Sequence, residues 1–153
     1  MLRVREGVSW RARIRVIARY RDGRVEVEEF DNLITNVGLN LIRDGLDGAD
    51  SEIKYVALGS NNTAPAVGDT TLGVEEFRKQ VTKQELGATG VMVTTVYIAP
   101  FEATSFTIEE IGWFAGVGAT ATANKGVMVA RVLYSRAKTN LESLQIERTD
   151  TFS

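Results

Sequence analysis

The sequence predicts a mostly β fold: an antiparallel β-sandwich or barrel-like domain of about eight strands, with one short helix and an extended N-terminal arm. Three observations predict it: period-two alternation over residues 10–20, a run rich in β-branched residues over 91–99, and a single short segment with helical spacing. A chain of 153 residues is long enough for one hydrophobic core and too short to divide comfortably in two. We therefore expect an arm at residues 1–9 and a single β-rich domain at 10–153.

The first strand is expected at residues 10–20, where side chains alternate between two faces as they do in a half-buried strand. One face presents four basic side chains, those of Arg11, Arg13, Arg15 and Arg19. Asp22-Gly23 then predicts a two-residue type I′ turn, because glycine readily takes the positive φ that this turn requires. In that register, Glu26 and Glu28 of the partner strand would meet the arginine face across the hairpin.

One helix is expected next, with Thr35 or Asn36 as its N-cap and Gly45 or Gly48 at its end. Its predicted apolar stripe consists of Leu39, Leu41, Ile42 and Leu46. At about ten residues the helix is short, too short to form a layer by itself. We expect it to plug one end of a sheet.

The rest of the chain predicts strands separated by loops of small residues. A compact apolar strand at 55–58 leads into a long loop containing Pro65 and Gly68. Further strands are expected at 77–86, 91–99, 105–110, 111–115, 126–135 and 144–152. The segment 116–125 has no large side chain to bury, which predicts a mobile loop or one that only a partner orders.

Composition excludes several classes of chemistry. The chain has no cysteine and no histidine, which removes disulfides, thiolate nucleophiles, the usual general base at neutral pH and the commonest metal ligand. No run of about 18 apolar residues and no signal-peptide pattern is present, so we expect neither a membrane span nor export.

The Glu-Glu pairs at 28–29, 75–76 and 109–110 are interpreted as solvated surface, because adjacent residues on a strand point to opposite faces and cannot share one site. We expect no enzyme activity.

Motifs for cofactors and metals are weak. Gly116-x-Gly118 follows a predicted strand, but no helix begins inside it to receive a pyrophosphate, so no cofactor is expected. Ser51-x-x-Lys54 lacks the companion motifs of a Ser/Lys nucleophile pair. The acidic cluster Asp44, Asp47, Asp50 and Glu52 does not match the spacing of a calcium loop, and it leaves a structural cation open without predicting a metal site.

Charge is distributed unevenly along the chain. Residues 1–21 contain seven arginines against Glu6, a net charge of +6, so the remaining residues carry −8 of the total of −2. This polarity suits head-to-tail contact between copies or docking on an acidic neighbour. The arginine stripe could also grip phosphates, but the aromatic residues Trp10 and Tyr20 lie on the opposite face, and no direct nucleic-acid binding is expected. An intersubunit contact and a plain ion-paired strand face remain as alternatives.

Four segments together resemble small bacteriophage virion proteins: Asn32–Leu46 (NLITNVGLNLIRDGL), Ile53–Arg78 with its ALGS and NTAP elements, Glu110–Phe114 (EIGWF) and Ala130–Lys138 (ARVLYSRAK). Within that group the chain looks most like the capsid decoration (auxiliary) protein of thermophilic long-tailed phages. The resemblance implies a non-enzymatic homo-oligomer, a trimer, assembled in the host cytoplasm and seated on the capsid exterior, where it cements the major capsid protein lattice. A tail or baseplate fibre-attachment module of the virion is the alternative.

The contact residues are assigned from charge and not from the resemblance. We expect the arm to add a strand to a sheet edge of a neighbouring protein, and the arginine strand to meet the capsid. The residues expected to bind the partner are Leu2, Arg3, Val4, Arg5, Arg11, Arg13 and Arg15. A ligand- or carbohydrate-binding β-sandwich that uses the loops at 60–71 and 116–125 is a third hypothesis, from a different functional class.

Overall fold

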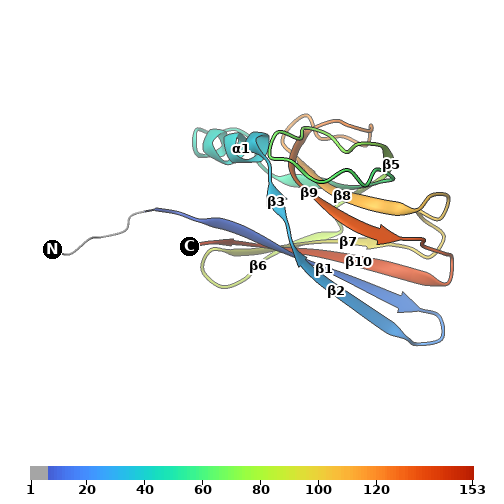
Figure 1. Ribbon diagram of the computed structural model, residues 1–153. Coiled ribbons are helices and arrows are strands. Elements are labelled where there is room, and N and C mark those ends of the chain that lie inside the picture. The colour runs from blue at the N-terminus through green and yellow to red at the C-terminus, as the bar shows by residue number, and fades with distance from the viewer. Residues whose placement is uncertain (1–6) are drawn as a thin grey trace.

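The computed structural model describes residues 7–153, which form two antiparallel β-sheets and one helix (Figure 1). Sheet A has the strand order β2-β1-β10-β7-β6, and sheet B has the order β3-β9-β8-β4-β5. The arrangement confirms the predicted mostly β fold, and the two separate sheets make it a sandwich. The strands are β1 (Trp10–Tyr20), β2 (Val25–Asp31), β3 (Leu33–Ile34), β4 (Ile53–Gly59), β5 (Glu75–Gln80), β6 (Lys83–Leu86), β7 (Val91–Ile98), β8 (Ile108–Ala115), β9 (Val127–Arg136) and β10 (Glu142–Phe152).

The core lies between the inner faces of the two sheets. Ile14 of β1 and Ile146 of β10 point inward from sheet A, and Ile111 and Trp113 of β8 pack against them from sheet B. All four side chains are buried. Full burial of an aliphatic side chain of this size contributes about 1.5–3 kcal/mol, so the alternating apolar positions of these strands supply the main driving force for folding.

A buried ion pair sits within this core, between the only two tryptophans of the chain. Arg148 donates from Nε and Nη2 to Asp150 at 2.9 and 2.8 Å, and Trp10 Nε1 donates to the same carboxylate at 2.8 Å. The Arg148 guanidinium carbon lies 5.9 Å from the Trp10 ring and 5.3 Å from the Trp113 ring. Since Trp10 belongs to sheet A and Trp113 to sheet B, this guanidinium joins the two sheets through cation–π contacts.

The β1–β2 hairpin differs from the prediction by one residue of register. Gly23 N–H donates to Tyr20 C=O and Tyr20 N–H donates to Arg24 C=O, which encloses a three-residue loop in which Gly23 has φ of +92°. This is a type I turn followed by a bulge. Because a one-residue slip reverses the faces of a strand, the prediction for Glu26 and Glu28 was wrong. The carboxylates that reach the arginine face are those of Glu29 and Asp31.

Three strand boundaries also differ from the prediction. The expected strand at 77–86 is two strands, β5 in sheet B and β6 in sheet A, because the chain crosses between sheets at Val81-Thr82. The crossing is fixed on both sides, since Val81 N–H donates to Lys54 C=O and Thr82 N–H donates to Thr95 C=O. A single strand, β8 (Ile108–Ala115), takes the place of the two expected at 105–110 and 111–115, and the short strand β3 was not predicted.

The helix α1 (Asn36–Leu46) confirms the predicted capping. Thr35 is the N-cap and its Oγ1 accepts a hydrogen bond from Gly38 N–H at 3.0 Å. A Cβ on Gly38 would lie 2.8 Å from the Val129 carbonyl oxygen, so glycine permits close packing of α1 on β9. Figure 1 shows α1 at one end of sheet B. Of the predicted apolar stripe, Leu41 is buried with Gly38, but Leu39 and Leu46 are exposed. No helix in residues 7–153 is long and apolar enough to cross a bilayer.

The outer face of sheet B is covered by two loops, residues 60–74 and 116–126 (Figure 1). Beneath them is a second, smaller apolar cluster composed of Ala57, Leu72, Phe114, Ala119 and Met128. Phe114 follows the core residue Trp113 along β8, and adjacent strand residues point to opposite faces, so this cluster lies on the side of sheet B away from sheet A. The outer face of sheet A has no such cover among the described residues.

Arg78 of β5 fastens the loop 116–126. Its Nη1 donates to the carbonyl oxygens of Thr120 and Lys125 at 2.9 and 2.7 Å, and its other nitrogens donate to the buried Glu75 carboxylate. Glu75 also accepts from Asn124 N–H at 3.2 Å. The prediction that this segment is mobile or needs a partner was wrong, because contacts within the chain hold it and Ala119 is buried.

We predict that Arg78→Ala will release the loop 116–126 and expose Lys125 to trypsin. Hydrogen bonds to a charged group contribute about 1.5–3 kcal/mol, so cleavage after Lys125 should accelerate about tenfold or more. Limited proteolysis followed by mass spectrometry measures this, with cleavage after Lys54 in β4 as the reference within the same digest. Arg43→Ala, which removes an arginine paired with Asp44 at the surface of α1, serves as the control variant. Equal rates after Lys125 in the two variants would contradict the assigned role of Arg78.

Candidate functional site

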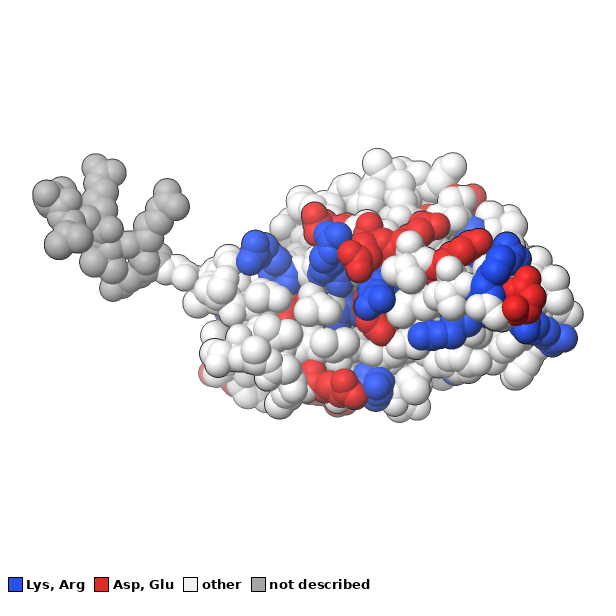
Figure 2. Space-filling view, turned by 90° about the horizontal axis from the view of Figure 1, so that it is seen from below, with Lys and Arg blue, Asp and Glu red and all other residues white. Residues whose placement is uncertain are grey.

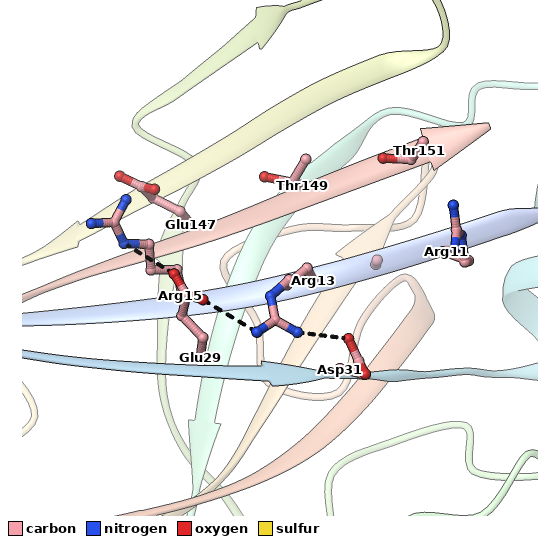
Figure 3. Close-up of a pocket in the computed structure, with 9 residues that line it drawn as sticks. Arg11, Arg13, Arg15, Glu29, Asp31, Glu147, Thr149 and Thr151 are labelled. Atoms are coloured by element: carbon pink, nitrogen blue, oxygen red, sulfur yellow. Dashed lines mark hydrogen bonds and ion pairs between the residues drawn. The ribbon is translucent and has the colours of Figure 1, made fainter. Parts of the chain in front are cut away.

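The outer face of sheet A brings together the basic side chains of β1. Register pairing places Arg13 beside Thr149 of β10 and Asp31 of β2, and it places Arg15 between Glu147 and Glu29. Between these side chains is a shallow depression of about 450 Å³, shown in Figure 3. The side chains that line it are those of Arg11, Ala12, Arg13, Arg15, Glu29, Asp31, Glu147, Thr149 and Thr151.

Ion pairs fix the orientation of two of these arginines. Arg13 donates to Asp31 at 3.1 Å and to Glu29 at 3.2 Å, and Arg15 Nε lies 3.7 Å from the other Glu29 oxygen (Figure 3). The hydrogen bond to Glu29 is the main reason why the pKa of Arg13 is above its usual value. The Arg13 side chain remains 56% exposed, so each pair contributes little to stability. The pairs hold the guanidinium groups in place at a surface that stays accessible.

The charges of this face are interleaved (Figure 2). Arg11 has no carboxylate within 4 Å among residues 7–153, and Arg19 donates to the neutral Gln145 at 2.8 Å. Arg13 and Arg15 are the members of the row that share acidic partners on β2. The surface therefore presents unneutralised guanidinium groups next to ion-paired ones, which fits a partner surface with charges of both signs.

The predicted contact residues divide into two groups. Arg11, Arg13 and Arg15 lie together on the outer face of sheet A, as the alternation predicts. Leu2, Arg3, Val4 and Arg5 lie outside the described residues. The predicted boundary of the arm at residue 9 needs one correction, because Ser9 and Ser153 exchange two backbone hydrogen bonds of 2.7 and 3.1 Å that continue the β1–β10 ladder. Gly7 and Val8 precede this pairing and are exposed.

The acidic residues at 44–52 do not converge. Asp44 pairs with Arg43 at 2.6 Å and Asp50 pairs with Lys54 at 2.5 Å. The hydrogen bond from Lys54 holds the pKa of Asp50 below its usual value. Within residues 7–153, no three acidic side chains gather closely enough to bind a metal ion. Two of the four carboxylates of the cluster thus have a protein cation as their partner.

Sequence reasoning missed a buried ion pair beneath the loop 60–74. Glu110 of β8 and Arg131 of β9 are 0% and 3% exposed, and Arg131 Nε donates to Glu110 at 2.6 Å. The same carboxylate accepts backbone N–H bonds from Asn61, Gly73 and Val74 at 3.3, 3.0 and 2.9 Å, and Arg131 Nη1 donates to Thr63 C=O at 2.8 Å. The interpretation of Glu109-Glu110 as a solvated pair was wrong for Glu110. The hydrogen-bond partners of this carboxylate are Arg131 and three backbone N–H groups of the loop, so its role is to hold the loop.

A second cluster closes the hairpin end of the sandwich. Arg136 donates to Tyr20 Oη at 2.6 Å, to Glu26 at 3.3 Å and to Glu142, which also accepts from Thr139 N–H at 2.8 Å. Burial by itself raises the pKa of Glu142, but the hydrogen bonds from Arg136 and Thr139 outweigh burial and hold that pKa below 4.5, its usual value. The ionised carboxylate thus joins β1, β9 and β10.

Comparison of the chain with protein-family models, with curated proteins and with solved structures finds no match. The arrangement of the described residues provides one face closed by fastened loops and one open face with an ordered row of arginines.

We predict that Glu110→Gln lowers the free energy of unfolding by about 3 kcal/mol, because it leaves the buried Arg131 with only the more distant carboxylate of Asp69, 3.5 Å from Nη1, as a counter-charge. Urea denaturation followed by circular dichroism measures the loss. Glu109→Gln is the matched control, since the neighbouring residue is only half-buried and has no ion pair within residues 7–153. A loss no larger than that of the control would contradict the role assigned to Glu110.

We also predict an acid-sensitive contribution from Glu142. Because its pKa in the folded state is lowered, its stabilisation is present above the unfolded-state pKa and is lost as the pH falls through the folded-state value. Glu142→Gln should therefore be less stable than the natural chain at pH 7, by about 1–3 kcal/mol for a buried charged hydrogen bond, and the difference should shrink below pH 4. Thermal denaturation of both proteins at pH 7 and pH 3 tests this, and an unchanged difference would refute it.

Proposed function

We propose that this chain is a non-enzymatic structural protein of a phage virion, which binds the capsid exterior as an oligomer and stabilises the major capsid protein lattice. The observation that supports it best is the asymmetry of the sandwich. One outer face is closed by loops that buried ion pairs fasten, and the other presents Arg11, Arg13 and Arg15 as an ordered, exposed row. A stable β module with one open, charged face is suited to adhesion.

Multivalency gives such a surface its strength. Single exposed ion pairs contribute about 0–1 kcal/mol, which is too little to hold a protein on a shell. An oligomer that presents several copies of the same face to symmetry-related sites converts later contacts into intramolecular ones, and its avidity then exceeds the affinity of one copy by orders of magnitude. A homotrimer on a capsid surface meets this requirement.

The charge pattern favours a protein partner over nucleic acid. A phosphate backbone is a uniform row of negative charges, and the proteins that bind it gain affinity by neutralising several phosphates at once. Here Arg13 and Arg15 already form ion pairs with Glu29 and Asp31, and Glu147 adds a further carboxylate to the same depression. A surface of another protein with both signs of charge complements this face better.

We predict that the double variant Arg13→Glu/Arg15→Glu will fold as the natural chain does, because both side chains are exposed, and will lose about tenfold or more of its affinity for the capsid. Co-sedimentation with capsids stripped of the protein measures the affinity. Arg43→Glu, on the distant surface of α1, is the matched control. Unchanged capsid binding by the double variant would overturn the assignment of this face.

Immunogold labelling of purified virions tests the location. Gold particles over the head are expected under the proposal. Gold confined to the tail would support the tail or baseplate module in its place, and labelling of neither would refute a virion role.

A further inference from the structure

The strand β2 forms one edge of sheet A, and its outward backbone is unpaired within residues 7–153. Tyr20 N–H donates to Arg24 C=O and Asn32 N–H donates to Ala12 C=O, at the two ends of the β1–β2 pairing. Since hydrogen-bonding direction alternates along an antiparallel strand, the even-numbered residues between these ends bond to β1. The N–H and C=O groups that point outward are those of Val25, Val27, Glu29 and Asp31.

This edge is regular enough to template another strand. The β1–β2 register continues without a bulge over seven residues of β2, about 23 Å of strand, and β2 contains no proline. Val25 and Val27 are 56% and 46% exposed. The other edges of the described sheets are less suitable: β3 has two residues, β6 has four, and β5 is flanked by the loop that Arg78 fastens.

Charge selects which strand can bind there. Four of the seven side chains of β2 are carboxylates, those of Glu26, Glu28, Glu29 and Asp31. Pairing of two β2 strands with each other would bring like charges together, which is destabilising. The edge therefore disfavours self-pairing and favours an extended strand that carries positive charge.

We propose that β2 of one copy accepts the N-terminal segment of a second copy, residues 1–6, as an added strand. The sequence Leu2-Arg3-Val4-Arg5 alternates apolar and basic residues with period two, and the segment has two arginines against Glu6. Arginines opposite the β2 carboxylates would form cross-strand pairs while the backbones exchange hydrogen bonds. The neighbouring protein whose sheet edge the arm joins is, on this inference, a second copy of the chain.

Pairing of the same segment with β2 of its own copy would require a fully extended connection that also reverses direction. Ser9 is fixed in the ladder with Ser153, so only Gly7 and Val8 remain to reverse the chain and cross from β1 past β2. That crossing spans two strand spacings, about 9.6 Å, and the three Cα–Cα steps from Ser9 to residue 6 cover at most about 11 Å when fully extended, which leaves no length for reversing the direction of the chain. The contact is therefore between copies. Since the donor and acceptor surfaces differ, it is heterologous and generates a ring when its rotation closes.

Light scattering over a concentration series tests the inference without any capsid present. The natural chain should self-associate. A chain lacking residues 1–6 and the variant Val27→Pro should each be monomeric. Proline at Val27 removes an outward N–H and leaves the bonds to β1 intact, while the control Val27→Ala retains the N–H and should associate. Self-association of the truncated chain, or a monomeric natural chain, would overturn the inference.

Two further measurements make the result decisive. Mixing the truncated chain with Val27→Pro should yield a heterodimer, because one supplies the edge and the other the strand; no heterodimer would refute the pairing. The double variant Glu28→Lys/Asp31→Lys keeps every backbone group but repels the arginines, so it should also be monomeric, and its association would contradict the charge argument.

This contact between copies rests on the proposed oligomer, but the two can be tested separately. Loss of self-association in Arg13→Glu/Arg15→Glu is not expected, whereas loss of capsid binding is.

Discussion

The ion pair between Glu110 and Arg131 is the constraint on which the arrangement of this protein depends. Placing two charges in a protein interior is costly unless their geometry is good and their remaining hydrogen-bonding capacity is satisfied. Here the remaining capacity is satisfied largely by the backbone of the loop 60–74. The loop cannot leave without exposing the pair, and the pair is stable only because the loop covers it. One outer face of the sandwich is closed in this way, and the opposite face is the one available to partners.

Arginine repeats this role at other positions. Arg78 fastens the second loop over sheet B, and Arg148 sits between the sheets with Asp150. Each buried guanidinium has a carboxylate within hydrogen-bonding distance, and the planar donor arrays of Arg78 and Arg131 also bond to backbone carbonyl groups of the loops. The chain thus uses arginine in two ways: buried members fix the architecture, and the exposed row on β1 forms the surface.

The segments from which the sequence predicts a phage virion protein contribute to the first of these uses. Asn61, Thr63 of the NTAP element, Glu110 of EIGWF and Arg131 of the ARVLYSRAK segment all meet at one buried site. These segments therefore fasten a loop to a sheet. The surface that we propose for partner binding lies on the other sheet and comes from β1, β2 and β10.

Local pattern predicted much of the fold, and long-range pairing explains what it missed. The bounds of β1 and the Thr35 cap follow from period-two alternation and from capping chemistry, which are local. The face of β2 on which Glu26 and Glu28 lie depends on whether the hairpin loop has two residues or three. The dipeptide Asp22-Gly23 is compatible with both lengths. Burial of Glu110 depends on Arg131, 21 residues away in the sequence, and the sheet change at Val81 depends on bonds to Lys54. The row of arginines was predictable because alternation alone places it.

The position of Arg148 between Trp10 and Trp113 has a spectroscopic consequence. The chain contains only these two indoles, one on each sheet, and both face the same guanidinium. Their intrinsic fluorescence therefore originates at the junction between the sheets, and its emission wavelength reports how closely the two halves of the sandwich are apposed. Separation of the two sheets would expose both indoles to water and shift that emission to longer wavelength.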